Sequence, residues 1–269
     1  MRESSLQSST APLWTTLRDH LDGVESEIIL SGQSGSEVLR LKPKGSSTRR
    51  FLKIGRGTAR DELVAEMTRL AWVSGHCMVP ETVCFALDRD VAWLLTTAMD
   101  GEGADAALSR EASSAGLIVD GIAAYLRDLH ALPISSCPYA AMLEGRMAEA
   151  KARVSAGLVD SSDFDECRRG WTAEDVWNAL EASKPAASSL VVTHGDFSLS
   201  NILVHNRRVS GVVDWGKLGV ADRHQDLALL WRDLSSFGSA LQERFLRSYG
   251  LATLDRRSLE FYALLDECF

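Results

Sequence analysis

Three side chains with oxygen atoms, Asp196, Asn201 and Asp214, lie close together in the segment 193–215, THGDFSLSNILVHNRRVSGVVDW. Asn201 follows Asp196 by five residues, and Asp214 comes after two apolar runs separated by a polar connection. A carboxylate on a loop can accept a hydrogen bond from a hydroxyl group and orient it for attack. A second carboxylate and an amide oxygen are suitable ligands for Mg²⁺, which also binds water and phosphate oxygens. These residue types point to transfer of a phosphate group to a hydroxyl.

The order and spacing of the three residues match the pattern of protein kinases. His194-Gly195-Asp196 stands where kinases have His-Arg-Asp, and Asp214-Trp215-Gly216 stands where they have Asp-Phe-Gly. In that pattern the first aspartate orients the substrate hydroxyl, and the asparagine and the last aspartate hold magnesium. Aspartate is also common in turns, so either aspartate alone would be explained as a turn residue. Two aspartates and an asparagine at this spacing favour the catalytic interpretation.

Short β-prone runs surround the three residues. They cover 190–193, 202–204 and 209–213, and the last two flank the polar residues 205–208. Two such runs around a short polar connection predict a β-hairpin. The hairpin would return Asp214 close to Asn201, so that their oxygens could share magnesium.

A lysine and a glutamate upstream extend the pattern. Lys53 lies inside the β-prone run 50–54, where kinases hold the lysine that contacts the α- and β-phosphates. An amphipathic helix is predicted over 61–73, where four apolar residues share one stripe: Leu63, Met67, Leu70 and Ala71. Glu66 in this helix is the candidate partner of Lys53, and Glu62 is the fallback. The alternative is that Glu66 is a solvated surface residue.

Two further segments predict contacts with a nucleotide. The glycine- and serine-rich loop 31–36 joins runs at 27–30 and 38–41. Its backbone N–H groups could approach phosphates closely, and Ser34 could add a hydroxyl, although the same loop alone would be an ordinary hairpin turn. A strand is predicted over 93–99, followed by a hinge at 100–103. Backbone groups near Thr97 and Met99 are expected to meet an adenine edge.

The chain resembles the aminoglycoside 3′-phosphotransferases over essentially its full length. The most specific segments are VVTHGDFSLSNILV, GVVDWGKLGVADRHQDLALLWRDL and FYALLDECF. Small-molecule kinases in general share the first pattern, whereas the continuation GKLGVADRHQDLAL and the acidic, aromatic end point to this family. The resemblance implies a kinase-like fold, ATP and Mg²⁺ as cofactors, and transfer of the γ-phosphate to the 3′-hydroxyl of aminoglycosides of the kanamycin and neomycin type, and hence antibiotic resistance.

The resemblance also assigns residues by position. Asp196 corresponds to the catalytic base, and Asn201 and Asp214 correspond to the metal ligands. Four residues correspond to nucleotide-binding groups: Ser34, Phe51, Lys53 and Glu66. Charged residues and the C-terminal carboxylate correspond to the substrate-binding set: Asp163, Asp165, Glu166, Lys217, Arg232, Asp233, Asp266, Glu267 and Phe269. The chain departs from the family at Lys217, where arginine is usual, at Trp215, where a smaller residue is usual, and at Cys268, where an aromatic residue would be unsurprising.

An acidic run supports a cationic substrate without reference to the family. Residues 160–166 contain four carboxylates in seven positions. Carboxylates around a cleft concentrate a negative potential that attracts a polycation such as an aminoglycoside, an effect that salt weakens. The alternative is a solvated helix start, because acids are favoured at helix N-termini.

The bulk composition narrows the class of protein. The chain has 269 residues, 45% hydrophobic content and a formal net charge of −8, which argues against nucleic acid as a partner. No run is long enough to cross a membrane, and the first ten residues lack the apolar region of a secretory signal. Five cysteines without CxxC spacing fit reduced thiols. These features predict a bacterial cytoplasmic enzyme without a membrane partner; they leave the oligomeric state open.

Together these elements predict an α+β, bilobal, protein-kinase-like fold. A small β-rich nucleotide-binding lobe is expected over residues 1–99 and a larger, mainly helical catalytic and substrate-binding lobe over 100–269. Helices are predicted at 118–129 and 142–156, and Thr172 is a plausible N-cap before 176–180. Asp226 opens an apolar helix, where it could be a cap or, as the family implies, brace the catalytic loop. Two alternatives remain: a kinase of the same fold for another small alcohol, such as choline, a sugar or a macrolide, and a nucleotide-binding protein without turnover.

Overall fold

The computed structural model describes residues 17, 20–21, 24–31, 35–43, 49–185, 189–251 and 255–269. The chain groups into two compact units, one comprising residues 1–100 and 211–216 and the other comprising 101–210 and 217–269. We call them unit 1 and unit 2. Unit 1 is built on a sheet and unit 2 is mainly helical, which confirms the predicted α+β class.

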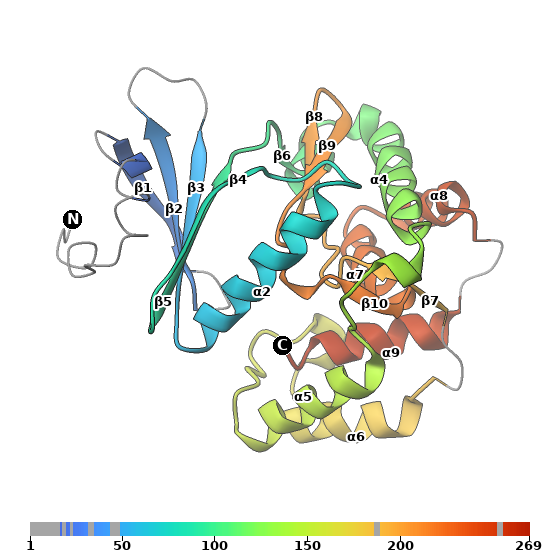
Figure 1. Ribbon diagram of the computed structural model, residues 1–269. Helices are drawn as coiled ribbons and strands as arrows, with labels where there is room; N and C mark the ends of the chain where they lie inside the picture. Colours follow the sequence, from blue (N-terminus) through green and yellow to red (C-terminus); the bar gives the residue numbers. More distant parts are fainter. Residues whose placement is uncertain are drawn as a thin grey trace. The chain divides into compact units, whose positions relative to one another are not determined.

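Unit 1 contains an antiparallel sheet with a helix packed on one of its faces. The strand order is β1-β2-β3-β5-β4. Its elements are β1 (Val24–Ser31), β2 (Glu37–Pro43), β3 (Arg50–Arg56), α2 (Thr58–Val73), β4 (Thr82–Leu87) and β5 (Val91–Thr97). Helix α2 runs along the sheet (Figure 1) and packs on β3 and β5.

The two faces of the sheet in unit 1 bury different residues, as the two-residue alternation of strands requires. One face carries a cluster that includes Leu39, Leu52, Trp93 and Leu95. On the other face, Ala92 and Leu94 of β5 pack with Leu63 of α2. Lys53 pairs with Leu94 in the β3–β5 register, so Lys53 belongs to the face that α2 covers.

Two predicted boundaries in unit 1 are wrong. Helix α2 begins at Thr58 rather than 61, directly after Gly57, whose φ of 59° ends the preceding strand. The strand predicted over 93–99 is β5, Val91–Thr97, so Met99 follows the strand. Met99 leaves the sheet because its side chain packs over Gly211, where an added Cβ would lie 2.1 Å from Cε of Met99.

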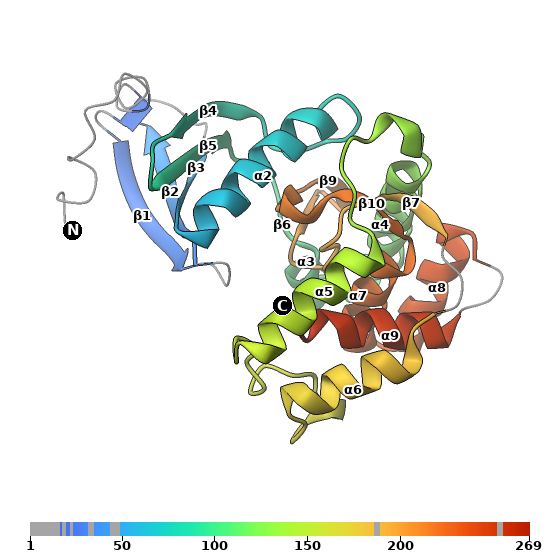
Figure 2. The ribbon, with the colours of Figure 1, turned by 60° about the horizontal axis from the view of Figure 1, so that its bottom comes forward.

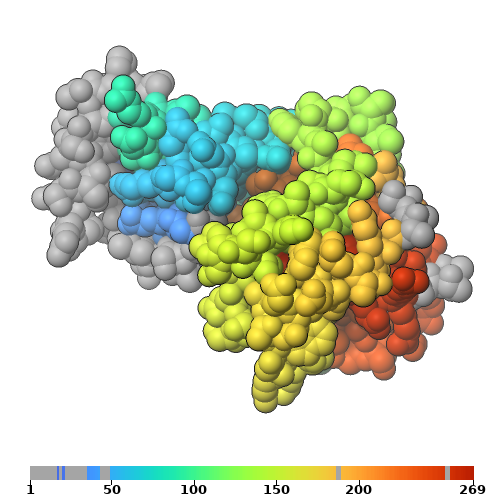
Figure 3. Space-filling model, turned by 90° about the horizontal axis from the view of Figure 1, so that it is seen from below, coloured from blue at the N-terminus to red at the C-terminus, as the bar shows by residue number. Residues whose placement is uncertain are grey.

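Unit 2 holds the remaining elements. Its helices are α3 (Ala104–Arg110), α4 (Ala115–His130), α5 (Leu143–Ser155), α6 (Ala173–Ser183), α7 (His224–Ser235), α8 (Ser239–Tyr249) and α9 (Arg256–Asp266). Its short strands are β6 (Glu102–Gly103), β7 (Leu190–Thr193), β8 (Ile202–His205), β9 (Arg208–Val212, whose last two residues belong to unit 1) and β10 (Gly219–Asp222). Helices α5, α6 and α9 pack together (Figure 2), and α5 and α6 cover one face of unit 2 in yellow-green and yellow (Figure 3).

Local sequence signals account for much of unit 2. Helix α4 buries Ile118, Ile122 and Leu126 on one stripe, as the period of its apolar residues predicts. Thr172 caps α6, because its hydroxyl accepts from the N–H of Asp175 and the Asp175 carboxylate accepts from the N–H of Thr172. Strands β8 and β9 are neighbours in one sheet, which confirms the predicted hairpin. Among the described residues, no helix is both long and apolar enough to cross a membrane.

Candidate active site

Lys53 forms the centre of a charged group in unit 1. Its Nζ donates to Oε1 of Glu66 at 2.7 Å and also contacts Oδ1 of Asp214. Glu66, and not Glu62, is the carboxylate of α2 that pairs with the lysine. Burial lowers the pKa of Lys53, but attraction to Glu66 and Asp214 outweighs this effect and raises its pKa above the ordinary value. The Lys53 amine therefore stays protonated, and its positive charge suits contact with a phosphate.

Asp214 has an unusual backbone held by a buried neighbour. Its φ is 64°, in the left-handed region that is uncommon for a residue other than glycine. Trp215 is fully buried, and its Nε1 donates to the carbonyl oxygen of Val212 at 2.9 Å. The large residue at 215 therefore anchors the chain in the core, while the Asp214 side chain stays 45% exposed.

The structure describes three of the other four residues predicted to bind the nucleotide. Phe51 shares the α2 face of the sheet with Lys53, because the two residues are two apart on β3. The N–H of Thr97 donates to the carbonyl oxygen of Glu81 at 2.9 Å, so this donor is already used. Met99 follows β5 and packs over Gly211. Ser34 lies outside the described residues.

In unit 2, residues 194–201 form the Asp196 loop between β7 and β8, and a buried carboxylate fixes its start. Asp226 of α7 is 0% exposed. Its Oδ2 accepts from the N–H of His194 and its Oδ1 from the N–H of Gly195, both at 2.8 Å. Asp226 therefore braces the Asp196 loop, as the resemblance implied, rather than acting as a simple helix cap.

Gly195 is required by the path of the loop. Its φ is 88°, and an added Cβ would lie 2.3 Å from the carbonyl oxygen of Lys217. Both the backbone angle and the close approach exclude a side chain. This explains why glycine stands where protein kinases carry arginine in the His-Arg-Asp pattern.

The groups around Asp196 suit a role with a hydroxyl and a metal. The Asp196 side chain is 33% exposed, and its Oδ2 lies 3.7 Å from Nζ of Lys217. Asn201 donates from Nδ2 to the carbonyl oxygen of Asp196 at 2.9 Å, which orients its amide group within the same loop. The N–H of Asp196 donates to Nδ1 of His194 at 3.2 Å. His194 thus shapes the loop, as predicted from its position.

Two arginines form ion pairs with acids that are predicted to bind substrate. We call Asp165, Asp233, Asp266 and Glu267 the acidic cluster. Arg168 donates from Nη1 to Oε1 of Glu267 at 2.6 Å and to Oδ2 of Asp165 at 2.9 Å. The backbone N–H of Asp165 also donates to Oε1 of Glu267 at 3.1 Å. These contacts join the segment 160–166 to the end of α9.

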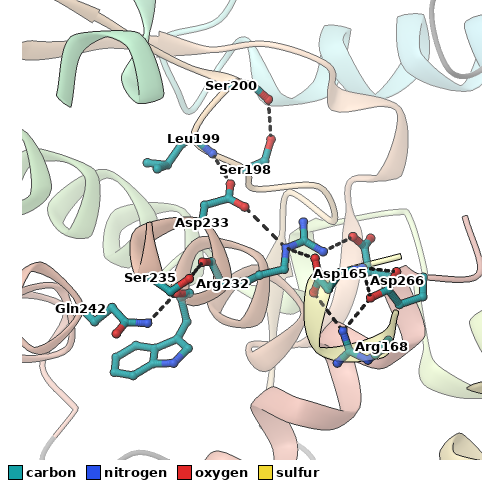
Figure 4. Close-up of polar contacts among 12 residues, drawn as sticks. Asp165, Arg168, Ser198, Leu199, Ser200, Arg232, Asp233, Ser235, Gln242 and Asp266 are labelled. Atoms are coloured by element: carbon teal, nitrogen blue, oxygen red, sulfur yellow. Dashed lines mark hydrogen bonds and ion pairs between the residues drawn. The ribbon is translucent and has the colours of Figure 1, made fainter. Parts of the chain in front are cut away.

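Arg232 connects the other members of the acidic cluster (Figure 4). It donates from Nη1 to Oδ2 of Asp266 at 3.0 Å, and its Nε lies 3.6 Å from Asp233 and 3.9 Å from Asp165. Asp233 in turn accepts from the N–H of Leu199 in the Asp196 loop at 2.9 Å. Burial raises the pKa of Asp233 above its usual range, although the Leu199 N–H and Arg232 oppose this shift. The acidic cluster is therefore in direct contact with the Asp196 loop.

The remaining predicted substrate residues are more exposed or differently engaged. Asp163 is exposed, and Glu166 is 84% exposed and paired with Arg169 at 3.1 Å. The acidic run ends at Glu166, the first residue of the three-residue 3₁₀ helix η4 (Glu166–Arg168), and no α-helix begins there. The main-chain oxygens of Cys268 and Phe269 accept from Arg153 at 2.6 and 3.3 Å. The Phe269 ring centroid lies 4.1 Å from Cζ of Arg146 and 5.9 Å from Nζ of Lys217.

Sequence reasoning missed Arg168, Arg153 and the residues behind Asp226, whereas Arg232 was in the predicted substrate-binding set. Arg168 and Arg153 pair with residues about a hundred positions away, and no local pattern signals such contacts. Only the i,i+3 spacing of Asp165 and Arg168 could have suggested an ion pair. His130 and Tyr249, which extend the contacts of Asp226, lie at the ends of two separate helices.

Comparison with known proteins agrees with this geometry. Residues 25–262 match the model of the phosphotransferase enzyme family. An aminoglycoside 3′-phosphotransferase of Escherichia coli is 45% identical over 238 residues, which cover 88% of this chain and 88% of that protein.

Comparison with solved structures also finds similarity to aminoglycoside phosphotransferases. The crystal structure of an aminoglycoside-3′-phosphotransferase of type VIII has a TM-score of 0.85 and 36% identity, covering 96% of this chain and 98% of the other. An aminoglycoside phosphotransferase of Streptomyces rimosus, solved in complex with ADP and streptomycin, has a TM-score of 0.82 and 29% identity, covering 94% and 96%. The predicted kinase-like fold is thereby confirmed.

Proposed function

This chain belongs to the aminoglycoside 3′-phosphotransferases of the phosphotransferase enzyme family, and we propose that it phosphorylates the 3′-hydroxyl of aminoglycosides of the kanamycin and neomycin type with ATP. The product would carry a dianionic group where the drug has a neutral hydroxyl. That change of charge would spoil the fit of the drug to ribosomal RNA and give resistance. We place this activity in the bacterial cytoplasm, where ATP and ribosomes are present.

The observation that carries the proposal is the bracing of the Asp196 loop. Two backbone N–H groups of the loop donate to the buried carboxylate of Asp226 at 2.8 Å, and Asp196 directly follows them. The partly exposed carboxylate of Asp196 can then accept a hydrogen bond from the sugar hydroxyl and orient it for in-line attack. The reaction needs no covalent intermediate with the enzyme, because phosphoryl transfer depends mainly on positioning and electrostatics.

The residues of each unit also fit ATP and magnesium. Lys53, held by Glu66 and with its pKa raised, provides a cation for the α- and β-phosphates. The carboxylate of Asp214 and the amide oxygen of Asn201 are oxygen donors of the type that Mg²⁺ prefers. When bound, Mg²⁺ would neutralise charge that develops on the phosphates. Phe51 would pack on the adenine ring, with backbone groups near Thr97 and Met99 at its edge.

The acidic cluster supports a polycationic substrate. Its four carboxylates outnumber the two arginines that form ion pairs with them, Arg168 and Arg232. Ammonium groups of the substrate would bind there, next to the Asp196 loop. Lys217, 3.7 Å from Asp196, would neutralise charge on the transferred phosphate while it leaves the Asp196 carboxylate available to the hydroxyl.

A matched pair of substrates tests the proposal. Purified protein is mixed with MgATP and either kanamycin or its 3′-deoxy analogue, and ADP release is measured. We expect turnover with kanamycin and none with the 3′-deoxy compound. The same pair is then compared in growth inhibition of a susceptible bacterium that expresses the protein.

The controls address the other small alcohols. Choline, simple sugars and a macrolide are offered at the same concentration and should give no ADP release above the background without acceptor. Equal turnover of kanamycin and its 3′-deoxy analogue would contradict the assignment of the 3′-hydroxyl. Turnover of choline or a macrolide in place of kanamycin would contradict the substrate class.

A further inference from the structure

His130 is connected to the Asp196 loop through the buried carboxylate of Asp226. It is the last residue of α4 and is only 8% exposed. Its Nε2 lies 3.0 Å from Oδ2 of Asp226, and its Nδ1 lies 2.7 Å from the hydroxyl of Tyr249, the last residue of α8. The imidazole therefore joins three helices, α4, α7 and α8, at the point that braces the loop.

The direction of these hydrogen bonds follows from the chemistry of the groups. An ionised carboxylate has no proton to donate, so Nε2 of His130 must donate to Asp226. In a neutral imidazole, Nδ1 then has a lone pair and accepts the proton of the Tyr249 hydroxyl. Asp226 thereby selects the tautomer that carries its proton on Nε2, so that Tyr249 donates to His130 and His130 donates to Asp226.

The Nε2–H is one of three donors to a carboxylate that is completely buried. The other two are the N–H groups of His194 and Gly195. A buried charge is tolerated only when hydrogen bonds replace its lost hydration. Oδ2 accepts from both His130 and His194, so removing the ring N–H leaves this oxygen with one of its two donors.

A shift of the Asp226 side chain would displace Asp196, because few contacts separate the two residues. Asp226 holds the two residues that directly precede Asp196, and the adjacent Gln225 donates from Nε2 to the carbonyl oxygen of Gly195 at 3.1 Å. Both residues of this support come from the first turn of α7. Small displacements of a catalytic group can cost about a hundredfold in rate.

We propose that His130 is a positioning residue for phosphoryl transfer, an inference that rests on the proposed function of the site. Its Nε2–H, in the tautomer that the Asp226 carboxylate requires, holds this carboxylate in the orientation that fixes the Asp196 loop. His130 acts through Asp226 and not on the substrate itself.

A pair of substitutions at His130 separates this role from simple packing. His130→Gln keeps an N–H donor close to the position of Nε2, whereas His130→Leu fills the space without a donor. We expect His130→Leu to lower kcat by roughly 10- to 100-fold, with KM for ATP and kanamycin within about twofold of wild type. His130→Gln should restore most of kcat. A folded His130→Leu protein with wild-type kcat, or a Gln variant no better than the Leu variant at equal Tm, would overturn the proposal.

A spectroscopic measurement decides the proposal without reference to activity. Nitrogen NMR of the histidine rings distinguishes an imidazole protonated at Nε2 from one protonated at Nδ1. We expect the Nε2–H form for His130 in the wild type and also in Tyr249→Phe, because Asp226 still requires this donor, with kcat of Tyr249→Phe lowered by less than about tenfold. A neutral ring protonated at Nδ1 in the wild type would overturn the inference even if His130→Leu fails to fold. An inactive wild type with the expected spectrum would contradict the proposed function alone.

Discussion

The Asp196 loop and the acidic cluster both depend on carboxylates, but different groups balance their charges. The carboxylate that shapes the loop, Asp226, is fully buried and accepts from backbone N–H groups and a histidine ring. The acidic cluster is partly open and is balanced by arginine side chains. Backbone donors cannot move away without unfolding the segment, whereas arginine side chains can turn toward solvent.

The difference indicates two kinds of task. A loop that must place one carboxylate to within a fraction of an ångström gains from fixed, water-free hydrogen bonds. A surface that binds a large polycation gains from carboxylates that stay solvated and paired with arginines until the ligand binds. Arg232 and Asp266 are partly exposed, so exchanging this arginine for a substrate ammonium costs less than breaking the mostly buried pair of Arg168 and Glu267. Substitutions in the two regions should therefore have different kinetic effects.

The largest effect is expected at Asp196. Asp196→Asn keeps the size of the side chain and should retain MgATP binding, while kcat falls by roughly 10²–10⁴, the usual contribution of a positioned proton acceptor. Steady-state kinetics with kanamycin measure this effect, and nucleotide titration provides the control. Turnover equal to wild type would remove Asp196 from its proposed role.

The next effect is expected at the end of α9. Deletion of residues 266–269 removes Asp266 and Glu267 and leaves Arg232 and Arg168 without these partners. We expect kcat/KM for kanamycin to fall by about 10²-fold, because the acids are lost and two cations remain in their place. Nucleotide binding should change little, and thermal unfolding is measured in parallel because Arg153 also loses its contacts with Cys268 and Phe269. Chain ends often tolerate deletion, so full resistance at normal protein level would contradict a substrate role for this segment.

A smaller and more selective effect is expected in unit 1. Phe51→Ala should raise KM for ATP by roughly tenfold, since stacking of an aromatic side chain on a base contributes about 1–3 kcal/mol. KM for kanamycin should stay within about twofold. Equal changes in both constants would show that the ring only supports the sheet.

The smallest effects come from two neighbouring acids that the structure separates. Asp165 binds Arg168 at 2.9 Å, whereas Glu166 is 84% exposed and pairs only with Arg169 among the charged groups described. Asp165→Asn should raise KM for kanamycin several-fold, and Glu166→Gln should change it less than twofold, because exposed pairs contribute about 0–1 kcal/mol. The comparison is made at two salt concentrations, and a larger effect at Glu166 would reverse the assignment.

Local patterns predicted the parts of the site that lie close together in the sequence. The spacing of Asp196 and Asn201 identified one loop, and the structure shows that the Asn201 side chain bonds the Asp196 backbone. Lys53 and Glu66 could be paired in advance because the kinase pattern places a lysine in this strand and a glutamate in the following helix, with Glu62 as the fallback.

Long-range charge pairing could not be predicted in this way. Arg168 is separated from Glu267 by 99 positions, and any of the many arginines in the sequence could have been the partner of Glu267. The same holds for the N–H of Thr97, whose use by Glu81 depends on how β5 lies beside the segment before β4. The start of α2 at Thr58 depended on the positive φ of Gly57, which composition alone did not reveal.

Gly195 has a consequence for the evolution of resistance. Its φ of 88° and the 2.3 Å approach of the Lys217 carbonyl oxygen to an added Cβ leave room for hydrogen alone. Every missense change that a single nucleotide can make in a glycine codon introduces a Cβ. Codon 195 therefore has no neutral missense neighbours. A resistance gene that acquires any missense change there should lose its phenotype in one step.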